Sequence, residues 1–433
     1  METFGLTPLI ATIVTLALAL IGLLVLVWLI QSAPPRTLTV TSGPAGSSFQ
    51  RFAESYEKAL AKHGVTLKIL PSGGSQENLQ RLQSAKSGVD IGFVQSGIAE
   101  GTNLSDLVSL GTVSYQPLWV FYRSATKITR LSELTGKRIA IGQVGSGTHA
   151  LALVLLQING ITGAPTTLVD SDAEAAAAAL MGGKLDAVFL MGDSAPIQTL
   201  RTLIREPEVQ IFNFTQADAY VRRYAYLNKI ELPQGSIDFG KNLPAQNIQI
   251  IGPTVELVAR ESLNSALSDL LLEVAQEVHG KSSLLQKRGE FPAPIEHEIA
   301  ISEDATRYYK SGKGLLYRSV RSFWLASLIN RILVAIVPIA LIIIPAVRFL
   351  PLAYRWSIQL KIYRCYRPLL LLEREALAPV TPGNGPELLR RLDEIEEAVR
   401  QLKVPASFAD QFYALKGHIV FVRQRLKAAT QPA

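Results

Sequence analysis

Two long apolar runs dominate the pattern of hydrophobic and polar positions along the 433-residue chain. Residues 8–30 are uncharged and almost wholly apolar, and a helix of that length rises far enough to cross a hydrocarbon core of about 30 Å. A second run, 332–347, reaches the same length when the apolar residues on both sides join it, and Arg331 then needs a polar partner inside the membrane. The pattern therefore predicts a short N-terminal segment, residues 1–7, and two transmembrane helices, 8–30 and 323–350.

Between these runs, short strand-like stretches alternate with stretches whose apolar residues recur at helical spacing. TLTVTSG, VTLKILPSGG and VDIGFVQSG are predicted strands, and the helices between them begin at SSFQRF and SQENLQ. The same order restarts with the strands RIAIG, TTLVD and LDAVFLMGD, which are separated by the helices THALALVLLQI and AEAAAAALM. Two βαβαβ units in tandem predict an α/β fold with two lobes that face each other across a cleft.

The chain after the second run is predicted to be helical. Basic and aromatic residues alternate between 351 and 377 at helical spacing, which is typical of a helix at a membrane surface. PELLRRLDEIEEAVRQLK and ASFADQFYALKGHIVFVRQRLKAA each carry an apolar stripe. We expect residues 351–433 to form a helical tail, either packed on itself as a hairpin or used to dock a partner.

Charge assigns the two sides of the membrane. Residues 36–321 are nearly neutral, whereas the chain from residue 348 onward is strongly basic, with its arginines concentrated just after the second apolar run. Cytoplasmic loops carry the excess of Lys and Arg, so the tail is predicted to be cytoplasmic and the large middle segment periplasmic, in a bacterial inner membrane. The overall charge of +7 then reflects topology, and no nucleic-acid partner is expected. The first run has a longer apolar core than a signal peptide and no preceding Lys or Arg, which favours an uncleaved anchor over a cleaved signal.

The residue types that carry most catalytic and metal chemistry are sparse. Cys365 is the single cysteine, so no disulfide can form within the chain, and the five histidines lack metal-ligand spacing. Ser146 and His149 do not match a nucleophile elbow, and the glycines of GQVGSG depart from the dinucleotide-binding spacing. We therefore expect no catalytic residues, no metal, no cofactor and no enzymatic activity.

Three turns rich in glycine and serine raise a different possibility. SGPAGSS, PSGGSQEN and QVGSGT each follow a predicted strand and open a helix, which is where ligands bind in open α/β sheets. Helix N-termini present unpaired N–H groups that hold carboxylates and phosphates, although Gly and Ser are also ordinary turn and cap residues. The predicted ligand-binding residues come from these turns and from the end of the third strand: Ser47, Ser48, Phe49, Gly74, Ser75, Gln95, Ser96, Gly145, Ser146, Gly147 and Thr148.

These segments also resemble a known family. ILPSGGSQENLQRLQSAKSGVDIGFVQS, together with GKRIAIGQVGSGTHALALVLLQINGI and ALMGGKLDAVFLMGDSAP, is similar to the TAXI-type solute-binding subunits of TRAP transporters. The resemblance covers about residues 36–300 and implies a type II periplasmic-binding-protein fold over 36–318. Lobe 1 would comprise about 36–118 and 245–318, and lobe 2 about 119–244. Such receptors close around a small organic anion, an amino acid or another carboxylate, and deliver it to a membrane permease.

Three departures from that family bear on function. AGSSF at 45–49 retains one aromatic residue, Phe49, where the family often has paired tyrosines, and SYQPLW places Gln116 where a carboxylate is common. The third departure is the pair of predicted anchors. We therefore expect a membrane-anchored solute-binding receptor of a TRAP-type system, with the lipid bilayer and a permease as partners. The alternative is a membrane-tethered sensor or scaffold whose cytoplasmic helices engage a partner.

Overall fold

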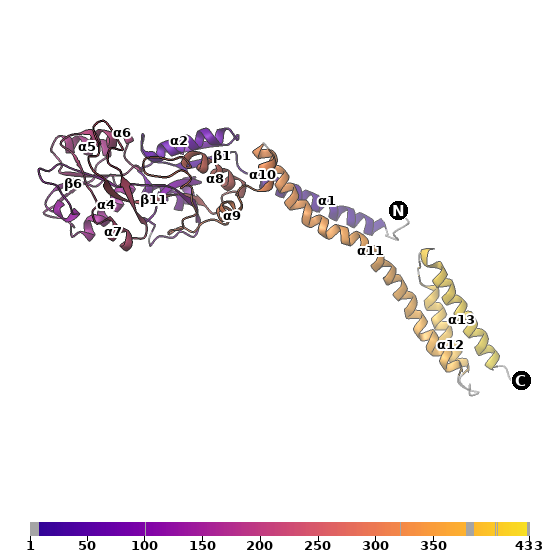
Figure 1. Cartoon of the computed structure of the whole chain (residues 1–433). Helices are drawn as coiled ribbons and strands as arrows, with labels where there is room; N and C mark the ends of the chain where they lie inside the picture. The colour runs from indigo at the N-terminus through magenta and orange to yellow at the C-terminus, as the bar shows by residue number, and fades with distance from the viewer. Residues whose placement is uncertain are drawn as a thin grey trace. The chain divides into compact units, whose positions relative to one another are not determined.

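The computed structural model describes residues 8–99, 101–320, 322–377, 385–402, 404 and 406–430. The chain divides into two compact units (Figure 1). One is Ala33–Ile329, which holds both sheets, and the other joins Met1–Ser32 to Asn330–Ala433. The fold is of the α/β periplasmic-binding-protein type with a helical C-terminal region, as the sequence predicts.

The first sheet of the larger unit has six strands, and we call the part around it lobe 1. Its strand order is β10-β11-β3-β1-β2, with β4 paired to β11. The parallel strands β1, β2 and β3 are connected by α2 and α3, in the predicted βαβαβ order. The elements are β1 (Thr37–Thr41), α2 (Ser48–Ala61), β2 (Thr66–Leu70), α3 (Ser75–Gln83), β3 (Ile91–Gln95), β4 (Leu107–Tyr115), β10 (Leu227–Leu232) and β11 (Ile248–Arg260).

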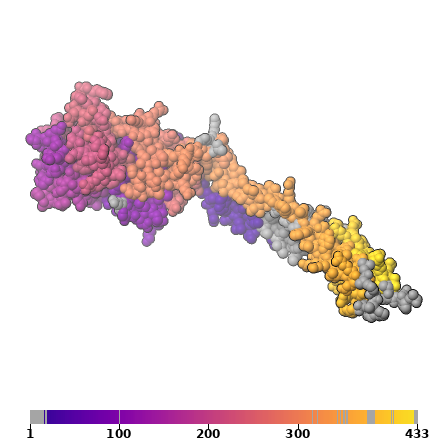
Figure 2. All heavy atoms as spheres, turned by 60° about the horizontal axis from the view of Figure 1, so that its bottom comes forward, coloured from indigo at the N-terminus to yellow at the C-terminus, as the bar shows by residue number. Residues whose placement is uncertain are grey.

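The second sheet has five strands in the order β7-β6-β8-β5-β9, and we call the part around it lobe 2. Here β6, β7 and β8 are parallel and β5 runs antiparallel to β8. The elements are β5 (Trp119–Tyr122), β6 (Arg138–Ala140), α4 (Gly147–Ile158), β7 (Thr167–Val169), α5 (Ala173–Met181), β8 (Ala187–Leu190), α6 (Ile197–Arg205), β9 (Gln210–Ile211) and α7 (Ala217–Arg223). In Figures 1 and 2 the magenta segments of lobe 2 gather at one end of this unit.

Two chain segments lie side by side where the lobes join. The Gln116 N–H donates to the Pro253 carbonyl at 2.8 Å, and the Leu118 N–H donates to the Ile251 carbonyl at 2.9 Å. The predicted strand SYQPLWVFYR is therefore divided here into the end of β4 and the whole of β5. A Cβ at Gly252 would lie 2.1 Å from the Gln116 carbonyl oxygen, so the absence of a side chain at Gly252 lets the two segments pair. This pair of segments forms the hinge.

Each lobe has its own apolar core. In lobe 1 the buried rings of Phe49, Tyr56 and Phe93 pack under the sheet against α8. Such spacing of aromatic residues along α2 is what gives this helix its buried face. The remaining helices of this unit are α8 (Ser265–His279), α9 (Glu303–Ser311), α10 (Leu315–Ser319) and the short 3-10 turns Ala85–Ser87 and Leu131–Leu134.

The other unit consists of helices. They are α1 (Pro8–Gln31), α11 (Phe323–Leu377), which begins in the larger unit, α12 (Gly385–Arg400) and α13 (Ala409–Thr430), with a 3-10 turn at Ala406–Phe408. Within the described part of the chain one segment, Phe323–Ile342, is long and apolar enough to cross a membrane, and Ala19–Gln31 is a shorter apolar helix. The Arg331 guanidinium donates to the Leu29 carbonyl, which supplies the polar partner that the sequence called for.

The helix that holds the predicted second span, 323–350, continues beyond it, and the bounds of the span stay a prediction. α11 runs as one helix to Leu377, and its last turns pack against α12 and α13 through a separate apolar cluster that includes Leu369, Leu392 and Leu415. The two stripes predicted on the tail helices are buried in this cluster. The tail is thus a three-helix bundle rather than a two-helix hairpin.

Candidate functional site

The turns singled out in the sequence meet across the boundary between the lobes, and we call this contact the seam. From lobe 1, the Ser48 N–H and hydroxyl both donate to the Gly192 carbonyl, at 2.7 and 2.6 Å. The Glu77 N–H donates to the Gly145 carbonyl at 3.0 Å. The Gln95 amide donates to the Gly147 carbonyl at 3.2 Å. The seam therefore joins the turns 43–48 and 72–76 to the turns 143–148 and 191–194.

Two glycines make this close approach possible. A Cβ at Gly74 would lie 2.6 Å from a carboxylate oxygen of Asp193, and the φ of +131° at Gly74 is one that other residues rarely adopt. A Cβ at Gly147 would lie 2.0 Å from the Gln95 side-chain oxygen. These glycines are thus required by packing between lobes, in addition to any role in a turn.

The anion expected at the helix N-termini is supplied by the chain itself. The side chain of Asp193 is fully buried and accepts hydrogen bonds from the Gly147 N–H at 2.6 Å and the Thr148 hydroxyl at 3.0 Å. It also accepts from the Ser194 hydroxyl at 3.0 Å and, more weakly, from the Ser75 N–H at 3.4 Å. Gly147 opens α4 of lobe 2 and Ser75 opens α3 of lobe 1. One carboxylate therefore sits at the positive ends of two helices from opposite lobes.

Burial raises the pKa of Asp193, because the carboxylate loses its hydration, and the hydrogen bonds from Gly147, Ser194, Thr148 and Ser75 oppose this shift only in part. The net direction is upward. The neutral form of this side chain is thus favoured by the folded protein relative to the unfolded chain.

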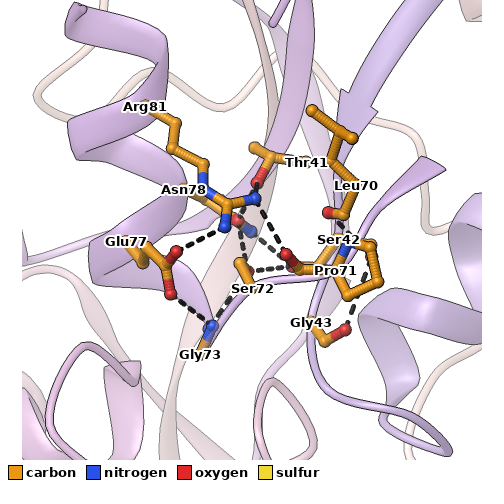
Figure 3. Close-up of polar contacts among 11 residues, drawn as sticks. Thr41, Ser42, Gly43, Leu70, Pro71, Ser72, Gly73, Glu77, Asn78 and Arg81 are labelled. Atoms are coloured by element: carbon orange, nitrogen blue, oxygen red, sulfur yellow. Dashed lines mark hydrogen bonds and ion pairs between the residues drawn. The ribbon is translucent and has the colours of Figure 1, made fainter. Parts of the chain in front are cut away.

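The polar residues of the PSGGSQEN motif bond within their own turn and to the end of the neighbouring strand β1 (Figure 3). The Asn78 amide donates to the Ser42 carbonyl at 2.6 Å, and its oxygen accepts from the hydroxyls of Thr41 and Ser72 at 2.6 and 2.7 Å. The Glu77 carboxylate accepts from the Gly73 N–H at 2.6 Å. This network explains the motif as a device that fixes the turn between β2 and α3.

Seven of the eleven predicted ligand-binding residues lie at the seam: Ser48, Gly74, Ser75, Gln95, Gly145, Gly147 and Thr148. The hydroxyls of Ser47 and Ser146 cap α2 and α4 by accepting from the N–H groups three residues on. Phe49 is fully buried in the core of lobe 1. Ser96 bonds to Thr254 on β11. Their role toward a ligand stays a prediction.

The seam does not hold a catalytic arrangement of Ser146 and His149. The Ser146 hydroxyl donates to the Gln143 carbonyl at 2.6 Å and accepts from the His149 backbone N–H, while the His149 ring faces Asp170 at 3.2 Å. A nucleophile would need its hydroxyl directed at the imidazole instead. In the described residues no group of three or more His, Cys, Asp or Glu side chains has a metal-binding arrangement.

A groove of about 790 Å³ lies next to the seam and is lined from both lobes. Ser48, Gln116 and Gly192 belong both to its wall and to the seam or hinge. The described residues that line it include three arginines and no acidic residue. Its principal side chains are Arg51 and Phe52 from α2, Tyr115 and Trp119 from the hinge strands, Arg201 and Arg205 from α6, and Leu284.

Arg51 and Arg201 line the same groove, Arg51 from α2 and Arg201 from α6. Burial lowers the pKa of Arg51, and the like charge of Arg201 lowers it further, whereas Glu54 acts in the opposite direction. Sequence reasoning missed both residues, because arginines on amphipathic helices are usually solvated. Asp193 was also missed by sequence reasoning. The signal available was its position directly after β8, at the same sheet edge as the predicted turns.

Several solved structures are similar to this chain at low sequence identity. An ancestral arginine-binding protein bound to arginine is 16% identical, covering 58% of this chain and 95% of its own, with a TM-score of 0.36. The substrate-binding protein of an amino acid ABC transporter is 14% identical, covering 56% and 92%, with a TM-score of 0.34. The periplasmic aliphatic sulphonate binding protein SsuA from Escherichia coli is 15% identical, covering 69% and 75%, with a TM-score of 0.34.

A family assignment rests on the sequence match. Residues 43–271 match the NMT1-like family, and this range holds the seam, the hinge and most of the groove. This family agrees with the expectation of a binding protein that is not an enzyme, whereas the narrower TAXI-type resemblance stays a prediction. Because the match spans more than half of the chain, the protein belongs to the NMT1-like family.

Proposed function

We propose that the protein is a membrane-anchored receptor that binds a small organic anion between its two lobes and presents it to a TRAP-type permease. The observation that carries this proposal is the groove, which is lined from both lobes by arginines and, among its described residues, by no acidic side chain. An amino acid or another carboxylate would neutralise this local positive charge. The seven predicted residues that lie at the seam would then act mainly by shaping it beside the ligand.

Ligand binding would be coupled to the angle between the lobes. The connections at Gln116–Leu118 and Ile251–Pro253 form a narrow hinge, whereas the groove draws its lining from α2 on one side and α6 on the other. A ligand that contacts both helices is bound most tightly when the lobes are closed, and this difference in affinity shifts the population toward closure. A permease could recognise the closed form.

The membrane arrangement is part of the same proposal. The apolar segment Phe323–Ile342 and the apolar helix α1 would anchor the chain in a bacterial inner membrane, with the two lobes in the periplasm. The basic residues after Phe323–Ile342 would hold the three-helix bundle in the cytoplasm. Anchoring at both ends of the ligand-binding unit would keep the receptor beside its permease.

A second candidate function is a ligand sensor or scaffold. The observation that favours it is the C-terminal bundle, in which α11, α12 and α13 share an apolar core of their own. Such a core lets the tail present a folded surface to a partner. Loss of a cytoplasmic interaction on truncation after residue 377, with solute uptake intact, would support the sensor and contradict a tail that serves the permease.

A thermal-shift screen of the full chain in detergent tests the ligand proposal. The panel should contain amino acids, monocarboxylates, dicarboxylates, sulfonates and phosphonates, with agmatine, which lacks a carboxylate, as a cationic comparison. A ligand at one hundred times its Kd should stabilise the fold by about 2.7 kcal/mol. Stabilisation by anions supports the proposal. Stabilisation by cations alone, or by no solute in the panel, would contradict it.

A further inference from the structure

The positive ends of α3 and α4 are not available to a solute as the seam stands. Asp193 already receives the Gly147 N–H at 2.6 Å and the Ser75 N–H at 3.4 Å, and its side chain is fully buried. A solute could take this place only by displacing a carboxylate held by four hydrogen bonds. The charge of the solute must therefore be recognised elsewhere.

The groove supplies positive charge that can recognise an anionic solute. Arg51 projects from the first turns of α2 in lobe 1, and Arg201 projects from the middle of α6 in lobe 2. In the described part of the chain neither guanidinium forms an ion pair within 4.0 Å, and the neighbouring Glu54 accepts a hydrogen bond from the Gln50 amide instead. Two cations from opposite lobes thus share one wall without a bound counter-charge.

We infer that Arg51 and Arg201 form a clamp across the two lobes for a doubly charged anionic solute, and that this clamp determines which anions the protein binds. The inference rests on the proposed function. A dianion neutralises both guanidiniums, whereas a monoanion leaves one charge uncompensated beside the other. The planar guanidinium also provides paired N–H donors that match carboxylate and phosphonate oxygens.

The same wall indicates what the rest of the solute is like. Phe52 and Leu284 lie on the groove surface, and Leu284 is 49% exposed. Trp119 and Ile197 add further apolar area from lobe 2. An apolar body attached to the dianionic head would cover these side chains and gain from their removal from water. The ligand class is thus an organic dianion with an apolar substituent, either a phosphonate or a dicarboxylate.

The clamp also accounts for coupling between ligand and closure. Arg51 and Arg201 line one groove from different lobes, so their like charges repel each other, and the charge of Arg201 adds to burial in lowering the pKa of Arg51. Because they belong to different lobes, this repulsion opposes closure until an anion lies between them. A dianion removes the repulsion and adds bonds to both lobes.

The test compares ligands that differ in charge and variants that differ in position. Binding of phenylphosphonate, phenylsuccinate and benzenesulfonate to the full chain in detergent is measured by calorimetry, with Arg51→Gln, Arg201→Gln and the matched control Arg222→Gln. Arg222 is an exposed arginine on α7 that does not line the groove. The two dianions distinguish phosphonate from dicarboxylate as the preferred head group.

We expect phenylphosphonate or phenylsuccinate to bind at least tenfold more tightly than benzenesulfonate. Each groove variant should remove that preference, and the control should keep it. The melting temperatures of the unliganded Arg51→Gln and Arg201→Gln proteins should equal or exceed that of the wild type, which shows that they fold. If a solute binds the wild type, Arg51→Gln and Arg201→Gln with the same affinity, the clamp is overturned and the proposed function still stands. Absence of binding by every solute, by contrast, would overturn both.

Discussion

Replacement of Asp193 tests the idea that the seam is held by a carboxylate of the chain itself. Asp193→Ala removes the acceptor for the Gly147 N–H and for the longer contact from Ser75. The hydroxyls of Thr148 and Ser194 lie 2.9 Å apart and can bond to each other once the carboxylate is gone. The main effect is therefore that the buried Gly147 N–H at the start of α4 loses its acceptor, and the loss of the longer contact from the Ser75 N–H at the start of α3 is a smaller effect.

The magnitude follows from those donors. A buried donor left without a partner costs about 1–3 kcal/mol, and removal of a buried negative charge offsets part of that loss. We expect Asp193→Ala to lower the free energy of unfolding by about 1–3 kcal/mol at neutral pH. Asp193→Asn should cost less, because its amide oxygen can still accept from the Gly147 N–H.

The pH dependence supplies a sharper test of the same reasoning. The pKa of Asp193 is raised in the folded protein, so protonation favours the folded state and the charged form is penalised. As the pH falls from neutral through the folded pKa, the wild type should gain stability relative to Asp193→Asn, which does not titrate. Below the unfolded pKa of a carboxyl group, about 3.9, the difference should become constant.

The assay is urea unfolding of the full chain in detergent between pH 4 and 7.5, followed by tryptophan fluorescence. Trp119 lies close to the hinge in lobe 2 and reports on the seam. The measured quantity is the free energy of unfolding of the wild type minus that of Asp193→Asn. If this difference does not change with pH, or falls on acidification, the interpretation that burial raises the pKa of Asp193 is refuted. An Asp193→Ala protein as stable as the wild type would refute the role of the seam contact.

Three further predictions concern other sites. Burial, with Glu298 and Glu296 adding like charge, raises the pKa of Glu256 to about 7. The free energy of unfolding of the wild type relative to Glu256→Gln should therefore fall as the pH rises through 7 in the same urea titration, and parallel curves would contradict this. Gly74→Ala should lower the urea midpoint more than its control Gly88→Ala, which also has positive φ but open space around its Cβ and should cost about 1–2 kcal/mol; equal midpoints would argue against the tight seam. Leu392→Ala, at a fully buried position, should destabilise the tail bundle by about 2–5 kcal/mol and lower its helicity by circular dichroism, with the transition of the lobes unchanged.

The sequence pattern predicted the parallel part of both sheets. TLTVT, TLKIL and IGFVQ became β1, β2 and β3, and serine in a turn before a helix became a cap, as Ser47 shows. These features depend on contacts between residues a few positions apart, which a reading of the chain can recover. The strand β10 (Leu227–Leu232) was missed because it pairs only with the distant β11.

The candidate site was predicted in part. The sequence placed the three turns at the carboxyl ends of strands, and the structure brings them together at the seam. The position of Asp193 directly after β8 was visible, but not its contact with the helix N-termini, and nothing indicated that Arg51 and Arg201 would share one groove. Each of these contacts joins residues from separate elements, and a single sequence carries no direct signal for which donor will meet which acceptor.

The sequence alone thus determined the elements of this protein: apolar helices by their length, lobes by the alternation of strand and helix periods, and helix starts by their capping residues. Tertiary structure decided where charge resides. The docking of lobe on lobe turned a predicted anion site into a contact with Asp193 and moved the unpaired positive charge to the groove between α2 and α6. The physical reason is that periodicity and capping are local properties of the backbone, whereas electrostatic pairing depends on distances that exist only after the lobes have packed.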